Sequence, residues 1–130
     1  MYSKTTNGIT VTVKPYFLDD QSSPQEGHYV WAYQVNIKNS SSNTIKLNHR
    51  NWVIIDANGK IMNIQGEGVV GEFPVLQPGE SFEYTSGTPL KTTNGFMQGF
   101  YLMSQNNGEQ LKIDIPTFSL DSPYGKKNYH

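Results

Sequence analysis

The chain has 130 residues, a formal net charge of −1 and no cysteine. This length suits one domain with one hydrophobic core, and the absence of cysteine excludes disulfides and thiolate sites. The basic residues are scattered and the net charge is near zero, so we expect no nucleic acid binding. Apolar runs are far shorter than the roughly 20 residues of a membrane span, and because residues 1–4 run into polar residues we expect no signal peptide there. We therefore expect a cytoplasmic protein without membrane insertion.

The first third of the chain predicts two strands joined by an exposed loop. Apolar and polar residues alternate over 9–13 and again, most clearly, over 29–37, a period of two that is typical of half-buried strands. We expect the first strand to be interrupted or bent at Pro15, because proline favours an edge or a bulge. The polar residues 19–27 form the connecting loop.

The middle of the chain predicts a hairpin followed by a long loop. Residues 44–47 and 52–56 have the character of strands, and Asn58-Gly59 supplies the positive φ angles of a tight turn before residues 60–64 pair back. Alternation then fails over 66–78, where we expect a long, partly buried loop. A loop of this length in a compact domain is more often functional than decorative.

The last third predicts a strand starting at Phe82 and a hairpin formed by residues 96–103 and 111–115. Seven or so short strands and no convincing helix predict an all-β protein, a two-sheet antiparallel β-sandwich of the immunoglobulin or fibronectin type III kind. We expect a single domain over 1–130, with a core from about residue 8 to 120 and a mobile tail at 121–130.

Residues 66–71 spell G-x-G-x-x-G, a pattern that can cradle a phosphate when a helix follows it. Here Phe73-Pro74 follows and no strand-helix-strand unit is evident, so we favour a glycine-rich connection between strands. Arg50 is the only arginine and the one candidate for bidentate binding of carboxylate or phosphate. We favour a structural hydrogen bond or salt bridge for it.

Sites for metals and for catalysis are not indicated by the sequence. The three histidines, His28, His49 and His130, are far apart, and no carboxylate run has ligand spacing. No serine lies in a nucleophile elbow. We therefore predict no metal, no cofactor and no enzymatic activity.

Several motifs together resemble the central signature of the ApaG family, and the similarity covers nearly the whole chain. They are Gln65-Gly66-Glu67-Gly68-Val69-Val70-Gly71, Pro78-Gly79-Glu80 and Tyr84-Thr85-Ser86-Gly87. The match extends upstream through Arg50-Asn51-Trp52 and downstream through Ile113-Asp114-Ile115-Pro116. This resemblance implies a fibronectin type III-like sandwich, a cytoplasmic bacterial protein and an association with cobalt and magnesium resistance or efflux. Similar domains in eukaryotic F-box adaptors and in a polymerase-delta-interacting protein imply protein binding.

We therefore predict a non-enzymatic binding module with an unknown protein partner and an indirect role in cobalt and magnesium homeostasis. The alternative is weak binding of a nucleotide or polyphosphate by the glycine-rich loop with Arg50. We expect the apolar residues of the segment 65–78 to form an exposed patch with an acidic rim of Glu67 and Glu72, or alternatively to cover an open end of the core. The candidate binding residues are Arg50, Gly66, Glu67, Gly68, Val69, Val70, Gly71 and Phe73.

Overall fold

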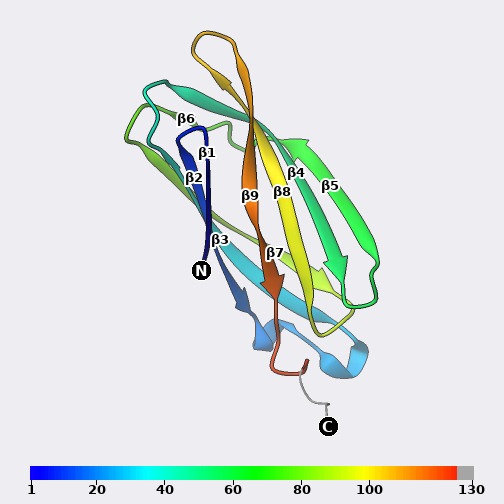
Figure 1. Ribbon diagram of the computed structural model, residues 1–130. Helices are drawn as coiled ribbons and strands as arrows, with labels where there is room; N and C mark the ends of the chain where they lie inside the picture. The colour runs from blue at the N-terminus through cyan, green and yellow to red at the C-terminus, as the bar shows by residue number, and fades with distance from the viewer. Residues whose placement is uncertain (126–130) are drawn as a thin grey trace.

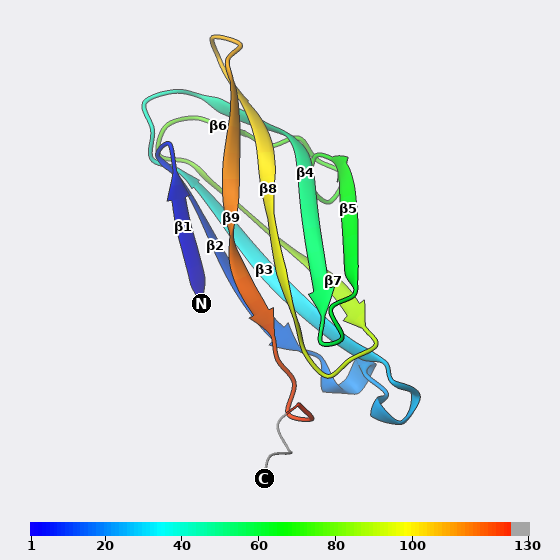
Figure 2. The same cartoon turned by 45° about the vertical axis from the view of Figure 1, so that its right-hand side comes forward.

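The computed structural model describes residues 1–125, which form two antiparallel sheets packed face to face (Figure 1 and Figure 2). The strands are β1 (Tyr2–Thr6), β2 (Ile9–Phe17), β3 (Tyr29–Asn39), β4 (Ile45–Asp56), β5 (Ile61–Glu67), β6 (Val75–Leu76), β7 (Ser81–Leu90), β8 (Gly95–Gln105) and β9 (Gln110–Leu120). One sheet has the order β1-β2-β3-β7 and the other β5-β4-β8-β9, with β6 paired to β4. The predicted all-β sandwich is confirmed.

The core lies between the sheets and is built from alternate residues of the strands. In β3 every second residue from Tyr29 to Ile37 is buried, while the residues between them are partly exposed. Trp31, Tyr101 and Phe118 are the largest fully buried side chains. The alternation in the sequence therefore identified the face of β3 that packs against the second sheet.

Strand β2 runs through Pro15 without an interruption, and Pro15 lies in the edge position that the sequence favoured for it. The N-terminal strand β1, which the sequence pattern did not reveal, pairs with β2 only from Ile9 to Val13. Among the described residues, β2 therefore has a partner on one side only at Pro15, namely β3, a position where proline is tolerated. Strand β2 continues to Phe17, which lies opposite Trp31.

Strand β4 is continuous, although the sequence suggested two separate strands. Its pairing with β8 shifts register between Leu47 and His49, which marks a β-bulge. Before the bulge the buried side chains are at Ile45 and Leu47, and after it they are at Trp52 and Ile54. The extra residue shifts the buried positions from odd-numbered to even-numbered residues. In the sequence this shift looks like the end of one strand and the start of another.

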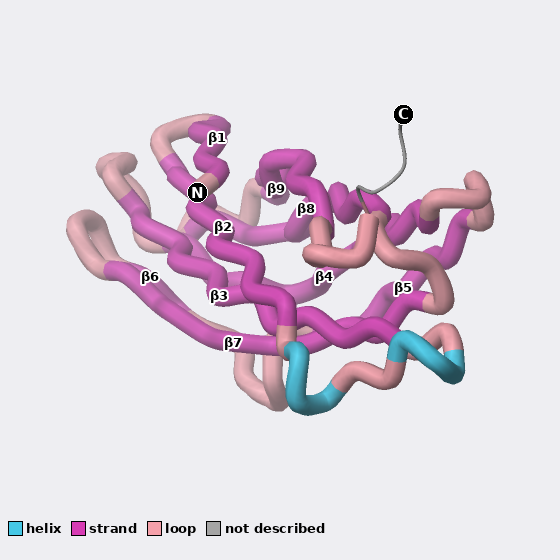
Figure 3. Tube along the Cα trace, turned by 90° about the horizontal axis from the view of Figure 1, so that it is seen from below, coloured by secondary structure: helices cyan, strands magenta, loops and turns pink. Residues whose placement is uncertain are grey.

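The loop between β2 and β3 contains two single turns of 3-10 helix, η1 (Asp19–Gln21) and η2 (Pro24–Glu26), drawn in cyan in Figure 3. After β9 the chain stays in contact with the sandwich. Trp31 Nε1 donates a hydrogen bond to the Asp121 carbonyl oxygen at 2.8 Å, and the Tyr124 ring packs 6.0 Å from that of Phe17. The remainder of the predicted tail, residues 126–130, lies outside the described residues. Within residues 1–125 no helix has the length and apolar character of a membrane span.

Candidate functional site

The glycine-rich segment interrupts a single edge strand that runs along β4. Strand β5 pairs with β4 as far as Glu67, and β6 resumes the antiparallel pairing opposite Ile45 and Lys46. Between them the Gly68 N–H donates to the Asn48 carbonyl oxygen at 3.0 Å, and the Leu47 N–H donates to that of Pro74 at 2.9 Å. The predicted loop over 66–78 is therefore corrected to a short excursion, residues 68–73, between two strands.

The excursion turns back on itself at Val70 and Gly71. The N–H groups of Val69 and Glu72 donate to each other's carbonyl oxygens at 2.9 and 2.8 Å. Val70 and Gly71 have φ angles of 43° and 78°, the signs found in a type I′ hairpin turn. Gly68 also has a positive φ of 63°, and a Cβ atom there would overlap the Glu72 carbonyl oxygen. The glycines thus serve backbone geometry, as the sequence pattern favoured.

Arg50 fastens the start of this excursion to β4. Its Nη1 donates to the carbonyl oxygens of Glu67 at 3.0 Å and Gly68 at 2.9 Å. Gly66 lies directly opposite Arg50 in the β4-β5 register, and a Cβ atom on Gly66 would come within 2.6 Å of Nη2. These contacts are the structural hydrogen bonds that we favoured for Arg50.

Three tyrosines lie near Arg50 in the core, an arrangement that the sequence did not predict. The hydroxyls of Tyr84 and Tyr101 share a hydrogen bond. Burial is the largest influence on the three phenols and raises the pKa of Tyr33, Tyr84 and Tyr101, while the Arg50 charge opposes this more weakly. Every second residue of β3, β7 and β8 faces inward, but only the sheet packing brings these phenols together.

The apolar residues of the segment divide between the core and the surface. Val69 is fully buried and Leu76 is 7% exposed, so both cover the core. Val70, Phe73 and Val75 are 53%, 46% and 56% exposed. Glu67 and Glu72 are exposed beside them, and the Lys46 Nζ lies 5.8 Å from the centre of the Phe73 ring. Val69 and Leu76 therefore cover the core, as one of our alternatives predicted. Val70, Phe73 and Val75 form the exposed apolar patch that the other alternative predicted.

Potential metal ligands do not gather in the part of the chain that the structure describes. No cluster of three or more His, Cys, Asp or Glu side chains occurs among residues 1–125. His130 lies outside the described residues. At the glycine-rich segment, the Arg50 guanidinium is hydrogen-bonded to the carbonyl oxygens of residues 67 and 68.

Comparison with known proteins places this arrangement in a family. Residues 19–105 match the ApaG domain. The chain belongs to the ApaG family. Protein ApaG of Paramagnetospirillum magneticum is 57% identical over 126 residues, which cover 97% of each chain. Protein ApaG of Parvibaculum lavamentivorans is 51% identical over 130 residues and covers all of both chains.

A solved structure agrees with the family assignment. The crystal structure described as a putative ApaA protein from Bordetella pertussis is 41% identical and has a TM-score of 0.87, covering 89% of this chain and 94% of that one. The ApaG resemblance suggested by the motifs is thereby confirmed, and with it a bacterial ApaG-type sandwich. The names of these relatives state no substrate, cofactor or partner.

Proposed function

We propose that this ApaG-family chain is a non-enzymatic protein-binding module whose contact surface includes Val70, Phe73 and Val75. The supporting observation is the backbone of Val70. A β-branched residue with a φ of 43° is an outlier, and the left-handed conformation costs it roughly 1–2 kcal/mol. Asn or Gly would suit this position of a type I′ turn better.

The side chain of Val70 does not offset this cost by packing. The Val70 side chain is 53% exposed, so it gains little from packing in the core. Backbone strain of this kind concentrates at binding sites, where the side chain serves a contact. Phe73 and Val75 extend the apolar surface, and Glu67 and Glu72 supply a polar rim like that of a small interface.

The nucleotide alternative receives less support from the same segment. A phosphate cradle needs free backbone N–H groups and an available cation. The N–H groups of Gly68, Val69 and Glu72 are already hydrogen-bonded to carbonyl oxygens, and Arg50 Nη1 donates to two more. A calorimetric titration with ATP and with dinucleoside polyphosphates tests this alternative, and we expect no saturation.

In this proposal the bound partner, and not this chain, acts on cobalt or magnesium homeostasis, so the role of the chain is indirect. The test is affinity capture from bacterial lysate followed by mass spectrometry, with Val70→Asn and Phe73→Glu compared to wild type. Both changes should remove the captured partner without lowering the melting temperature, because both side chains are exposed.

Phe96→Glu serves as the matched control, since Phe96 is 52% exposed but lies on β8. It should retain the partner. Equal recovery of the same partner by wild type, Val70→Asn and Phe73→Glu would show that this segment is not the contact surface. If wild type captures no specific partner at all, the protein-binding proposal itself fails.

A further inference from the structure

One side of the sandwich is open because the second sheet extends past the first. Strands β5 and β7 are edge strands of the two sheets among the described residues. Met62 and Ile64 of β5 lie directly opposite Ile54 and Trp52 of β4, so all four side chains face the same side of the sheet. Ile54 and Trp52 are 1% and 3% exposed, whereas Met62 and Ile64 are 38% and 43% exposed. The first sheet therefore lacks a strand beneath β5.

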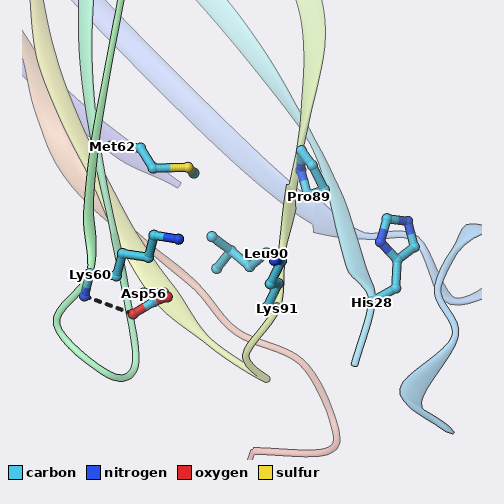
Figure 4. Close-up of a pocket in the computed structure, with 7 residues that line it drawn as sticks. All are labelled: His28, Asp56, Lys60, Met62, Pro89, Leu90 and Lys91. Carbon is cyan, nitrogen blue, oxygen red and sulfur yellow. Dashed lines mark hydrogen bonds between the residues drawn. The ribbon is translucent and has the colours of Figure 1, made fainter. Parts of the chain in front are cut away.

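A row of hollows follows β7 along this open side, and we call it the edge groove. At the end of β7 a hollow of about 220 Å³ lies between Met62 and Leu90 (Figure 4). A second, of about 150 Å³, lies between Ile64 and Gly87. A third, at the start of β7, lies between Phe73 and Phe82. The edge groove thus runs from Phe82 to Leu90.

We infer that the edge groove binds an extended segment of a partner protein, which joins the first sheet as a new strand beside β7. Neighbouring strands lie about 4.8 Å apart and packed sheets about 10 Å apart, so a strand added to β7 would pass beneath β5. Its inward side chains would cover Met62 and Ile64, and the β7 backbone would supply the hydrogen bonds of strand addition. This inference rests on the proposed function and specifies the form in which the partner binds.

Charge at the Leu90 end indicates which segment fits. Lys60 and Lys91 line the hollow there (Figure 4), and neither forms an ion pair within residues 1–125, where Lys4 with Asp114 is the pair observed. The Asp56 carboxylate in the same hollow accepts hydrogen bonds from the backbone N–H groups of Asn58 and Lys60, each at 2.9 Å. The partner segment therefore carries alternating apolar residues and an acidic residue beside Lys60 and Lys91.

The backbone of β7 limits where the new strand pairs. Pro89 has no N–H to donate, which protects the last residues of this edge. Pairing is therefore expected along residues 81–88, with the acidic residue of the partner extending beyond them to the two lysines. At the opposite end, Glu72 and Glu80 line the hollow and favour a basic residue. This charge polarity sets the direction of the bound segment.

The test uses a displayed library of random peptides of about 12 residues, enough to span the ten residues of β7 at roughly 3.3 Å per residue. Selection on the immobilised wild-type protein should enrich peptides that alternate apolar residues and carry Asp or Glu toward one end. Synthetic versions of the enriched peptides are then titrated by calorimetry. Replacing their acidic residue by Lys should weaken binding about tenfold.

Variants of the protein locate the binding site. Ile64→Lys and Met62→Lys should each weaken peptide binding about tenfold, and their melting temperatures show whether both fold. Ile61→Lys is the matched control, because Ile61 is 59% exposed and adjacent residues of a strand face opposite sides. It should bind normally. Hydrogen exchange of the β7 amides over residues 81–88 should slow when the peptide is bound.

The outcomes separate this inference from the proposed function. If the Ile64→Lys and Met62→Lys variants still capture the partner from lysate but Phe73→Glu does not, the edge groove is not the binding site. The proposed protein-binding function would still stand. Failure to enrich any alternating acidic peptide likewise overturns it. So does a dimer of the protein that Ile64→Lys dissociates, because a second copy would then occupy the groove. The absence of any partner of wild type in lysate, by contrast, refutes the proposed function.

Discussion

The guanidinium of Arg50 lies against the backbone of its cross-strand neighbour Gly66, where a Cβ atom would come within 2.6 Å of Nη2. The end of a long side chain usually moves aside at little cost. Arg50 cannot do so freely, because its Nη1 donates to the carbonyl oxygens of Glu67 and Gly68. The glycine and the arginine therefore depend on each other.

We expect this dependence to appear as non-additivity in a double-mutant cycle. Arg50→Met should lower the free energy of unfolding by about 1.5–3 kcal/mol, because it removes hydrogen bonds from a charged donor. Gly66→Ala should cost about 1–2 kcal/mol by displacing that donor. Urea denaturation of the double variant should show a loss smaller than the sum by about 1 kcal/mol. Additive losses would show that the two positions act independently.

Two glycines of the excursion should respond differently to alanine. Both have positive φ angles, 63° at Gly68 and 78° at Gly71, so each substitution should cost roughly 1–2 kcal/mol. A Cβ atom at Gly71 would have nothing within 4 Å, whereas at Gly68 it would overlap the Glu72 carbonyl oxygen. Gly68→Ala should therefore cost about 1 kcal/mol or more beyond Gly71→Ala, as measured by chemical denaturation. Equal losses would show that the overlap at Gly68 is relieved without cost.

The sequence predicted the class of fold because alternation is a local signal that survives in most strands. It failed where one added residue changed the phase, at the bulge of β4 between Leu47 and His49. It also failed at β1, whose residues are mostly polar and exposed. Gly66 has no side chain to continue the alternation, so the sequence predicts a loop where β5 in fact continues to Glu67.

The candidate site could be predicted only in part. The motif at residues 66–71 indicated special backbone geometry, because glycine is the residue that adopts positive φ angles without steric cost. The tyrosines around Arg50 and the edge groove depend on how one sheet is offset from the other. That offset depends on all the packing contacts across the core, so it cannot be predicted from the alternation of apolar and polar residues within one strand.

We expect the isolated protein to bind neither cobalt nor magnesium tightly. Residues 1–125 contain no cluster of three or more potential metal ligands, and tight binding of a divalent cation needs several such groups held together. Isothermal titration calorimetry with each chloride salt should give only heats of dilution. A stoichiometric site with a micromolar dissociation constant would contradict the prediction and support a direct role in metal resistance.

The tyrosines near Arg50 predict that stability falls at alkaline pH. Burial raises the pKa of Tyr33, Tyr84 and Tyr101 in the folded state, whereas an unfolded tyrosine has a pKa of about 10. Folding therefore keeps protons that the unfolded chain releases. Their contribution to stability is fully present below about pH 10 and decreases as the pH rises toward the folded-state pKa values. Urea midpoints measured across this range should decline above about pH 10.

Single variants assign this decline to the buried phenols. Tyr84→Phe should lower the urea midpoint at neutral pH, because it leaves the buried Tyr101 hydroxyl without its partner, at a cost of about 1–3 kcal/mol. Its midpoint should then fall less steeply above pH 10 than that of wild type, because the variant has one fewer buried phenol whose pKa is raised by folding. Tyr16→Phe is the control, because Tyr16 is 46% exposed, and its profile should follow wild type. If Tyr84→Phe and wild type lose stability with the same slope, the ionisation of this phenol does not drive alkaline unfolding.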